Sequence, residues 1–156
     1  MRSLQKNHLQ LLAFTLLLTL FFSNSFAQSR SSKDRICGKW ENEAKTLRIQ
    51  ISTQGTDFTA KIIWFSDTEG KPMNYWKDKR NPDPKLRNRT ILGMNILRGL
   101  KYNEAKGTWE DGMVYDSKHG KEWNASAAID SKGQLKVRGY WHFKWIGKNM
   151  KFHRIP

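Results

Sequence analysis

The sequence predicts an all-β protein in which an antiparallel up-and-down meander closes into a barrel. Three observations lead to this fold class. Apolar and polar residues alternate along much of the chain beyond residue 46, no long helical stripe follows residue 27, and short polar turns separate the alternating rows. Roughly seven to nine strands fit this pattern, which suits one closed or strongly curved sheet.

The first residues are predicted to be a secretory signal peptide. Arg2 and Lys6 precede an apolar run from Leu9 to Phe22, and Ser25-Phe26-Ala27 places small residues where a signal peptidase cleaves. Cleavage after Ala27 of the 156-residue chain leaves 129 residues, enough for one domain with one core. An uncleaved membrane anchor is the alternative, although the run is short for a span of about 20 residues.

After cleavage, we expect residues 28–36 to form a flexible segment and residues 37–156 to form a single barrel domain. No later stretch is apolar enough to form a transmembrane segment in the mature chain. The predicted location is therefore outside the inner membrane, periplasmic or extracellular.

The alternating rows follow one another along the domain. They occupy residues 47–51, 58–65, 123–129 and 135–145, and a last strand carries Met150 and Phe152. In the clearest row, one face holds Leu135, Val137, Gly139, Trp141, Phe143 and Trp145. Since successive side chains of a strand point to opposite faces, we expect this set to line the core.

Turn sequences separate several of these rows. Asp130 to Gly133 and Asn103 to Gly107 are typical of hairpin connections. Gly147-Lys148 is expected to turn the chain into the last strand.

Three residues at the two ends of the domain have a structural interpretation. Gly38 and Trp40 form a Gly-x-Trp motif on the first strand, and Arg154 lies on the last strand. This resembles the lipocalin-type signature, in which a late arginine packs over the indole. Such a cation–π contact would close the base of the barrel.

Motifs spread over residues 38–154 together resemble one family. They are Gly38-x-Trp40, Asn81-Pro82-Asp83-Pro84, Leu86-Arg87-x-Arg89, Gly93, Ile96-Leu97-x-Gly99-Leu100, Trp109, Gly112, Tyr115-Asp116, Gly120-Lys121, Leu135-x-Val137-Arg138-Gly139-Tyr140 and Arg154. The set resembles the secreted bacterial family catalogued as domain of unknown function 2147. Ser117, Trp123 and Phe152 depart from it, where Pro, Tyr and Trp are usual. The resemblance implies a lipocalin-like (calycin) barrel and supplies no established activity, so no catalytic residue is assigned.

The segment from Asn81 to Leu100 is the first candidate for a binding site. Two prolines bracket Asp83, so its first half is a shaped loop in which the Asn81 side chain forms an Asx-turn. Arg87 and Arg89 share one face if extended and could clamp a carboxylate or phosphate. In the structural alternative, which we favour, Asp83 pairs with one arginine and pins the loop across the barrel mouth.

Two further groups are candidate ligand contacts. Residues 71–80 interleave aromatic and basic side chains, as in surfaces that stack sugars or bases, or as in an exposed loop anchored by its aromatics. A polar hairpin that contains His119 is flanked by Tyr115, Asp116 and Lys121. The Asp, His and Lys side chains could carry out acid–base chemistry. A structural role as a hairpin turn is the alternative, and we favour it.

Arg138 and Tyr140 are similar to the Arg-x-Tyr pair with which fatty-acid-binding proteins hold a carboxylate. An interior Arg138 would turn Leu135 and Val137 to solvent, unless a bulge near Gly139 resets the register. The outward orientation of Arg138 is therefore favoured.

The chain is strongly basic, with a net charge of +14 that falls to +12 once Arg2 and Lys6 are removed. Residues 131–156 contain no Asp or Glu, and their basic residues are Lys132, Lys136, Arg138, Lys144, Lys148, Lys151 and Arg154. Such a surface attracts polyanions, which outside the cytoplasm are lipopolysaccharide, anionic glycans and phospholipid headgroups rather than nucleic acid. The alternative is that the charge only maintains solubility.

Cys37 is the single cysteine, so no intramolecular disulfide can form. A small buried thiol is favoured over pairing between chains. No metal site or cofactor is predicted, because His119, His142 and His153 are widely scattered and no cofactor motif occurs.

Three functions remain, in order of preference. The first is a non-enzymatic binder of a small amphipathic or anionic ligand. The second is a surface-interaction protein that holds anionic envelope polymer on the basic face around Lys136, Lys144, Lys148 and Lys151. The third is a hydrolase of unknown substrate, for which the spacing of the residues selects no reaction.

Overall fold

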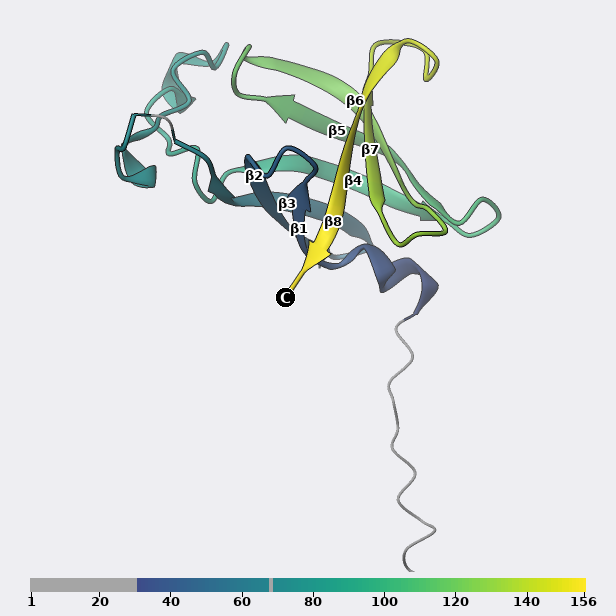
Figure 1. The fold of residues 1–156 in the computed structure, drawn as a ribbon. Coiled ribbons are helices and arrows are strands. Elements are labelled where there is room, and N and C mark those ends of the chain that lie inside the picture. The colour runs from purple at the N-terminus through teal and green to yellow at the C-terminus, as the bar shows by residue number, and fades with distance from the viewer. Residues whose placement is uncertain (1–30, 68) are drawn as a thin grey trace, which may run out of the picture.

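A computed structural model describes residues 31–67 and 69–156, so the predicted signal peptide lies outside the described residues. Eight antiparallel strands form a closed barrel in which each strand pairs with the next and β8 pairs with β1 (Figure 1). The strands are β1 (Gly38–Asn42), β2 (Leu47–Gln54), β3 (Asp57–Phe65), β4 (Asn95–Asn103), β5 (Thr108–Asp116), β6 (Lys121–Ile129), β7 (Leu135–Tyr140) and β8 (Gly147–Ile155). The predicted fold class is confirmed.

Three short 3-10 helices accompany the barrel: η1 (Ser32–Ile36), η2 (Met73–Tyr75) and η3 (Pro84–Leu86). Among the described residues, no helix is long and apolar enough to cross a membrane.

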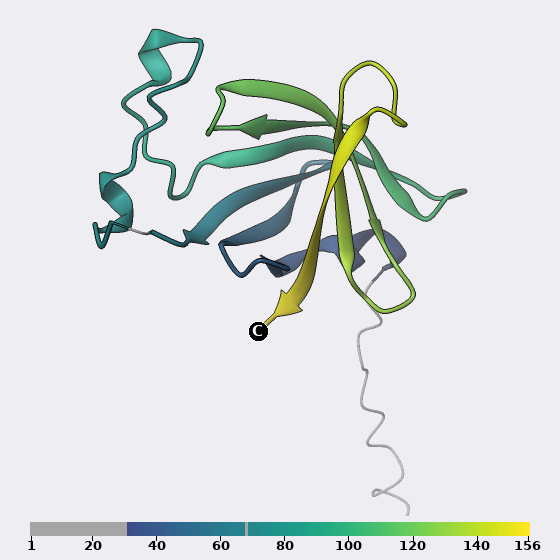
Figure 2. The ribbon, with the colours of Figure 1, turned by 45° about the horizontal axis from the view of Figure 1, so that its top comes forward.

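The connections of this meander alternate between its two ends. We call one end the mouth, where residues 43–46, 66–94, 117–120 and 141–146 join β1 to β2, β3 to β4, β5 to β6 and β7 to β8. The other end, the closed end, holds the three remaining turns and η1. Figures 1 and 2 show the long β3–β4 connection and η1 on opposite sides of the barrel.

Large side chains fill the interior towards the closed end. The fully buried ones are Trp40, Trp109, Phe58, Ile36, Ile49, Ile51, Leu97, Leu100 and Leu135. Phe58 and Trp109 meet edge to face with ring centroids 6.3 Å apart, a favourable aromatic geometry. The alternating rows of β2, β3 and β6 contribute the inward set, as expected from their period of two.

The first and last strands are joined by the contact between Arg154 and Trp40. The guanidinium carbon of Arg154 lies 4.2 Å from the centroid of the Trp40 ring, and its Nη1 donates to the Cys37 carbonyl at 2.8 Å. Gly38 has a φ of +138°, and a side chain there would collide with that guanidinium. Cys37 is half-buried and packs against the core.

Residues 32–36 were expected to belong to a flexible segment, and this was wrong. They form η1, whose Ile36 is completely buried. Trp40 Nε1 donates to the Ile36 carbonyl at 2.8 Å, and Trp109 Nε1 donates to the Lys33 carbonyl at 3.1 Å. The two core indoles therefore hold η1 over the closed end of the barrel.

The expected end of the seventh strand was also wrong. β7 stops at Tyr140, which pairs with Gly147, so Gly147 opens β8 instead of forming the turn. The connection is residues 141–146, closed by a hydrogen bond from the Trp141 amide to the Ile146 carbonyl at 3.4 Å. Its aromatic side chains, predicted to lie in the core, are exposed.

Candidate functional site

A short ladder folds the β3–β4 connection back on itself. The amide of Asp78 donates to the carbonyl of Arg89 at 3.0 Å, and the amide of Ile91 donates to the carbonyl of Trp76 at 3.0 Å. Lys77 and Thr90 form the bridge between these two hydrogen bonds. This ladder brings together side chains that are eleven residues apart in the chain.

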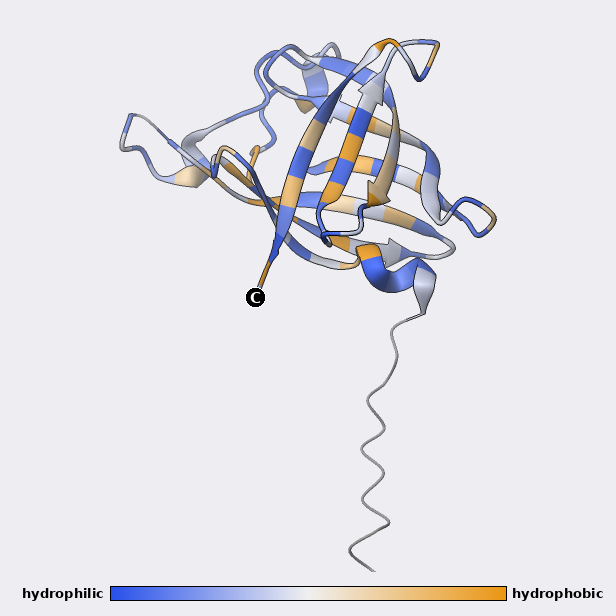
Figure 3. Cartoon of the chain, turned by 45° about the vertical axis from the view of Figure 1, so that its right-hand side comes forward, coloured by the Kyte–Doolittle hydropathy of each residue, from blue (hydrophilic) through white to orange (hydrophobic). Residues whose placement is uncertain are grey.

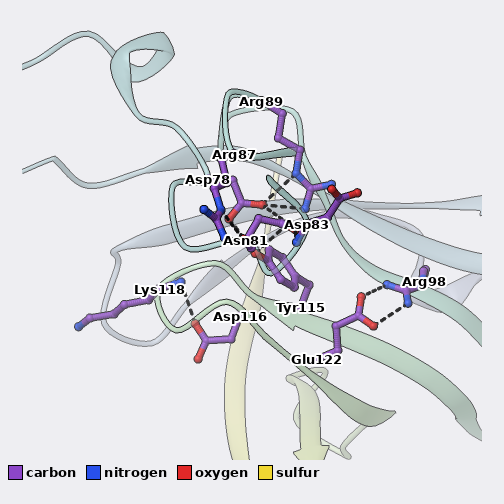
Figure 4. A network of polar contacts seen from close by, with 10 residues as sticks. All are labelled: Asp78, Asn81, Asp83, Arg87, Arg89, Arg98, Tyr115, Asp116, Lys118 and Glu122. Carbon is purple, nitrogen blue, oxygen red and sulfur yellow. Dashed lines mark hydrogen bonds and ion pairs between the residues drawn. The ribbon is translucent and has the colours of Figure 1, made fainter. Parts of the chain in front are cut away.

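A buried carboxylate, Asp78, lies at the centre of a polar network on this connection (Figure 4). Its Oδ1 accepts the hydroxyl of Tyr115 at 2.7 Å, and its Oδ2 accepts the side-chain amide of Asn81 at 2.7 Å. Arg89 donates to the same Oδ2 through Nε at 3.0 Å and lies 2.9 Å away through Nη2. A buried carboxylate with a cation and several donors is a stable arrangement.

Tyr115 connects this network to the barrel wall. Its ring packs with Ile62 and Met94, and the Arg89 guanidinium lies 5.3 Å from the ring centroid. The pKa of Tyr115 is raised to about 12. Burial is the largest cause, and the hydrogen bond to Asp78 and the negative charge of Asp78 add to it. Tyr115 therefore stays a neutral donor at physiological pH and ties the connection to β5.

The favoured pairing of Asp83 with an arginine was wrong, since Asp78 is the partner of Arg89. Asp83 instead caps η3, because its Oδ1 accepts the Lys85 amide at 2.9 Å. Asn81 forms the expected Asx-turn, with its Oδ1 accepting the Asp83 amide at 2.9 Å.

The two arginines of the loop do not act together. Arg87 donates through Nε to the carbonyl of Asn81 at 2.8 Å, whereas Arg89 is engaged by Asp78. The clamp that an extended chain would present is therefore absent from this loop as it is folded here.

The other candidates lie apart from this network. Asp116 closes the β5–β6 turn by accepting the Lys118 amide at 3.0 Å and lies 2.6 Å from His119 Nδ1. Lys121 opens β6 and is exposed. These contacts are those of a hairpin turn.

Arg138 faces the β7–β8 connection and not the barrel interior. Its guanidinium donates to the carbonyls of Lys144 and Trp145, the latter at 3.1 Å, and to Asn149 Oδ1 at 2.9 Å. Tyr140 is buried, and this burial, with the charge of Asp111, raises its pKa. The outward orientation favoured from the sequence is thus the one observed.

A groove of about 420 Å³ lies between the β3–β4 connection and the β5–β6 turn. It is lined by Glu69, Lys71, Tyr75, Trp76, Lys77, Lys79, Arg80, Ser117 and Lys118. Only Glu69 among these is acidic, and it pairs with Lys71 at 3.3 Å. Lys77, Lys79 and Lys118 have no carboxylate partner among residues 31–67 and 69–156. We call this the basic groove.

The two walls of the basic groove are held together. Nη1 of Arg80 donates to the Lys118 carbonyl at 2.6 Å. Gly120 has a φ of +65°, and a side chain there would collide with the Arg80 carbonyl, so the turn approaches the connection closely only because this residue is glycine. The Asp78 network fixes the same connection from the other side.

Aromatic rings form part of the groove lining. Tyr75 is half exposed and meets Trp76 edge to face at 5.6 Å, and Lys71 Nζ lies 4.4 Å from the Tyr75 ring centroid. The indole N–H of Trp76 is buried and has no hydrogen-bond acceptor among the described residues. An unsatisfied buried donor costs about 1–3 kcal/mol. Of the sequence candidates, the segment 71–80 is the one that contributes to this lining, through Lys71, Tyr75, Trp76, Lys77, Lys79 and Arg80.

The described residues contain no group of three or more His, Cys, Asp or Glu side chains that could hold a metal ion.

An eight-stranded closed barrel, with a 3-10 helix over one end and an arginine packed on the first-strand tryptophan, is a lipocalin-like structure. The fold is similar to a solved structure described as "Protein HP1028 from the human pathogen Helicobacter pylori belongs to the lipocalin family", with a TM-score of 0.64 and 28% sequence identity over 77% of this chain and 82% of that chain.

Residues 38–154 match the family described as "Uncharacterized protein conserved in bacteria" (domain of unknown function 2147), and the chain belongs to this family. The resemblance noted from the sequence is therefore confirmed. No curated protein matches the chain.

Proposed function

We propose that this protein is a non-enzymatic binder of a small anionic, amphipathic ligand, and that the ligand occupies the basic groove. The observation that carries the proposal is the composition of the groove, in which five basic side chains and two aromatic ones face a single carboxylate. A negative group would contact Lys77, Lys79 or Lys118, and a flat or apolar part would lie against Tyr75 and Trp76.

The packing of the barrel supports a site outside its interior. Lipocalin-like barrels can hold a ligand inside, but here bulky indole, phenyl and aliphatic side chains occupy the interior towards the closed end. The basic groove lies at the mouth, on the β3–β4 connection, and loops fixed by a rigid scaffold are where binding residues concentrate.

We place this function outside the cytoplasm, as the predicted signal peptide implies. The ligand would then be an anionic molecule of the cell envelope or of the medium. Attraction from partly exposed lysines is screened by salt, so affinity should fall as ionic strength rises.

Native mass spectrometry of the protein purified from its own cell envelope tests the proposal. The expected result is a retained small molecule on the wild-type protein and its loss from the double variant Lys79→Glu with Lys118→Glu. The matched control is Lys61→Glu with Lys132→Glu, which makes the same change of charge at exposed positions away from the groove and should keep the ligand. Retention of the molecule by the groove variant would refute this site, and absence of any molecule from the wild type would refute the binder.

A further inference from the structure

The β7–β8 connection, residues 141–146, is an exposed apolar hairpin tip. Trp141 is 56% exposed, Phe143 59%, Trp145 76% and Ile146 49%. Figure 3 shows this hairpin tip projecting beyond the strands at the top of the view, with hydrophobic residues in it. Large apolar side chains gathered at one exposed place on a small protein mark an interaction surface.

The rings at the hairpin tip are ordered with respect to one another. Phe143 and Trp145 stack with ring centroids 5.8 Å apart and an interplanar angle of 19°. Trp141 meets Trp123 edge to face at 5.6 Å, which joins the base of the tip to β6. Phe143 and Trp145 therefore form an outward-facing pair while Trp141 anchors the hairpin tip to the barrel.

Arg138, on β7, donates hydrogen bonds to backbone carbonyls of the hairpin tip. Its guanidinium donates to the carbonyls of Lys144 and Trp145, and the amide of Ile146 donates to the Phe143 carbonyl at 3.0 Å. Backbone groups that enter an apolar medium need partners inside the protein. Carbonyls of this hairpin tip already have them, which lowers the cost of leaving water.

Cations outnumber carboxylates around the hairpin tip. Lys144 lies within the hairpin tip, and Lys148 and Arg138 flank it. Burial lowers the pKa of Lys144, and the positive charge of Lys106 lowers it further. From β5, two carboxylates face the same region: Glu110, which pairs with Lys144, and Asp111, whose charge acts on Tyr140. The excess of positive charge is complementary to an anionic surface.

We propose that the hairpin tip inserts into the interface of a lipid bilayer that carries anionic headgroups. Trp and Phe favour the membrane–water interface, and Lys and Arg can keep their charged ends at headgroup level while their stems lie on apolar surface. A projecting tip with a few large apolar side chains and a cationic rim fits a soft lipid surface better than it fits the flat, extended interface of a protein complex. This membrane contact is separate from the basic groove, and neither proposal depends on the other.

Vesicle co-sedimentation tests this proposal. The exported protein is used after its N-terminal sequence has been read, so that residues 1–27 add no affinity of their own. We expect binding to phosphatidylcholine vesicles that contain phosphatidylglycerol, and at least tenfold weaker binding to phosphatidylcholine alone. The double variant Phe143→Ser with Trp145→Ser should lose at least tenfold in binding to the anionic vesicles. Leu86→Ser, which removes an exposed apolar side chain that belongs neither to the hairpin tip nor to the lining of the basic groove, should bind as the wild type does.

A conservative variant tests insertion even if the double variant folds poorly. Brominated acyl chains should quench the tryptophan fluorescence of the wild type, and Trp145→Phe should still bind but show less quenching. A soluble polyanion such as dextran sulfate distinguishes the alternative partner. If dextran sulfate displaces the vesicles completely, and the variant Phe143→Ser with Trp145→Ser still binds them, the basic surface binds polyanionic polymer and the insertion proposal fails. No binding to anionic vesicles, or no quenching of the bound wild type, overturns it as well.

Discussion

The hydroxyl of Tyr115 donates to Asp78 at 2.7 Å across 37 residues of sequence. This hydrogen bond joins β5 to the β3–β4 connection, which also contacts Tyr115 through Asn81 and Arg89 and the β5–β6 turn through Arg80. It makes the β3–β4 connection a fixed wall of the basic groove, so the groove owes its shape to a buried network that does not itself line it.

Tyr115→Phe should destabilise the protein by about 1–3 kcal/mol, because Asp78 then loses one donor in a buried position. Urea unfolding monitored by tryptophan fluorescence measures the change. Tyr102→Phe is the matched control, since the Tyr102 ring also packs against the core while its hydroxyl makes no hydrogen bond within residues 31–67 and 69–156. Equal effects of the two substitutions would mean that the hydroxyl of Tyr115 adds nothing.

The pKa of Tyr115 predicts a loss of stability at high pH. A phenol titrates at about pH 10 in an unfolded chain, and in the folded protein the pKa of Tyr115 is about 12. Because the folded pKa is the higher one, this stabilising contribution is complete below pH 10 and is lost as the pH rises towards 12. Stability should therefore fall over that range, and less steeply in Tyr115→Phe. A fall of equal slope in both proteins would contradict the assignment.

Arg89→Ala should lower the free energy of unfolding by about 2–3 kcal/mol, because it removes two charge-assisted contacts to a buried carboxylate. Arg98→Ala is the control. Arg98 makes a two-pronged pair with Glu122 at 2.5 and 2.9 Å, but both side chains are exposed, so its loss should cost about 0–1 kcal/mol. Chemical denaturation of both variants compares them directly, and a larger loss in Arg98→Ala would show that burial of Asp78 does not set the strength of the network.

Arg154→Ala should destabilise the closed end by about 1–2 kcal/mol, since the indole of Trp40 loses its cation and the Cys37 carbonyl loses a donor. Lys151→Ala, on the same strand, removes only an exposed pair with Glu43 at 3.5 Å and should change little. Thermal unfolding followed by circular dichroism measures both variants. Similar midpoints would argue against a closing role for Arg154.

Local patterns in the sequence predicted most of the barrel, because a strand with one buried face has a period of two in its own residues. The same period misled at the seventh strand. Trp141, Phe143 and Trp145 continue the alternation of β7, but the chain leaves the sheet after Tyr140, where the pairing with β8 ends at Gly147. The residue at which β7 stops pairing is set by β7 and β8 together, so the sequence of β7 alone does not reveal it.

The candidate site was predicted in composition but not in its contacts. Residues 71–80 were recognised as basic and aromatic, which is what the groove lining shows. Asp83 was preferred to Asp78 as the partner of an arginine because it lies between two prolines. The choice of Asp78 follows from the backbone ladder beside Arg89, which sequence spacing does not reveal.

A crystal structure of the protein as isolated from its own envelope tests the binder most directly. We expect electron density for a small anionic molecule in the basic groove, against Tyr75 and Trp76 and within reach of Lys79 or Lys118. Density for a ligand inside the barrel, with the groove filled only by water, would contradict it.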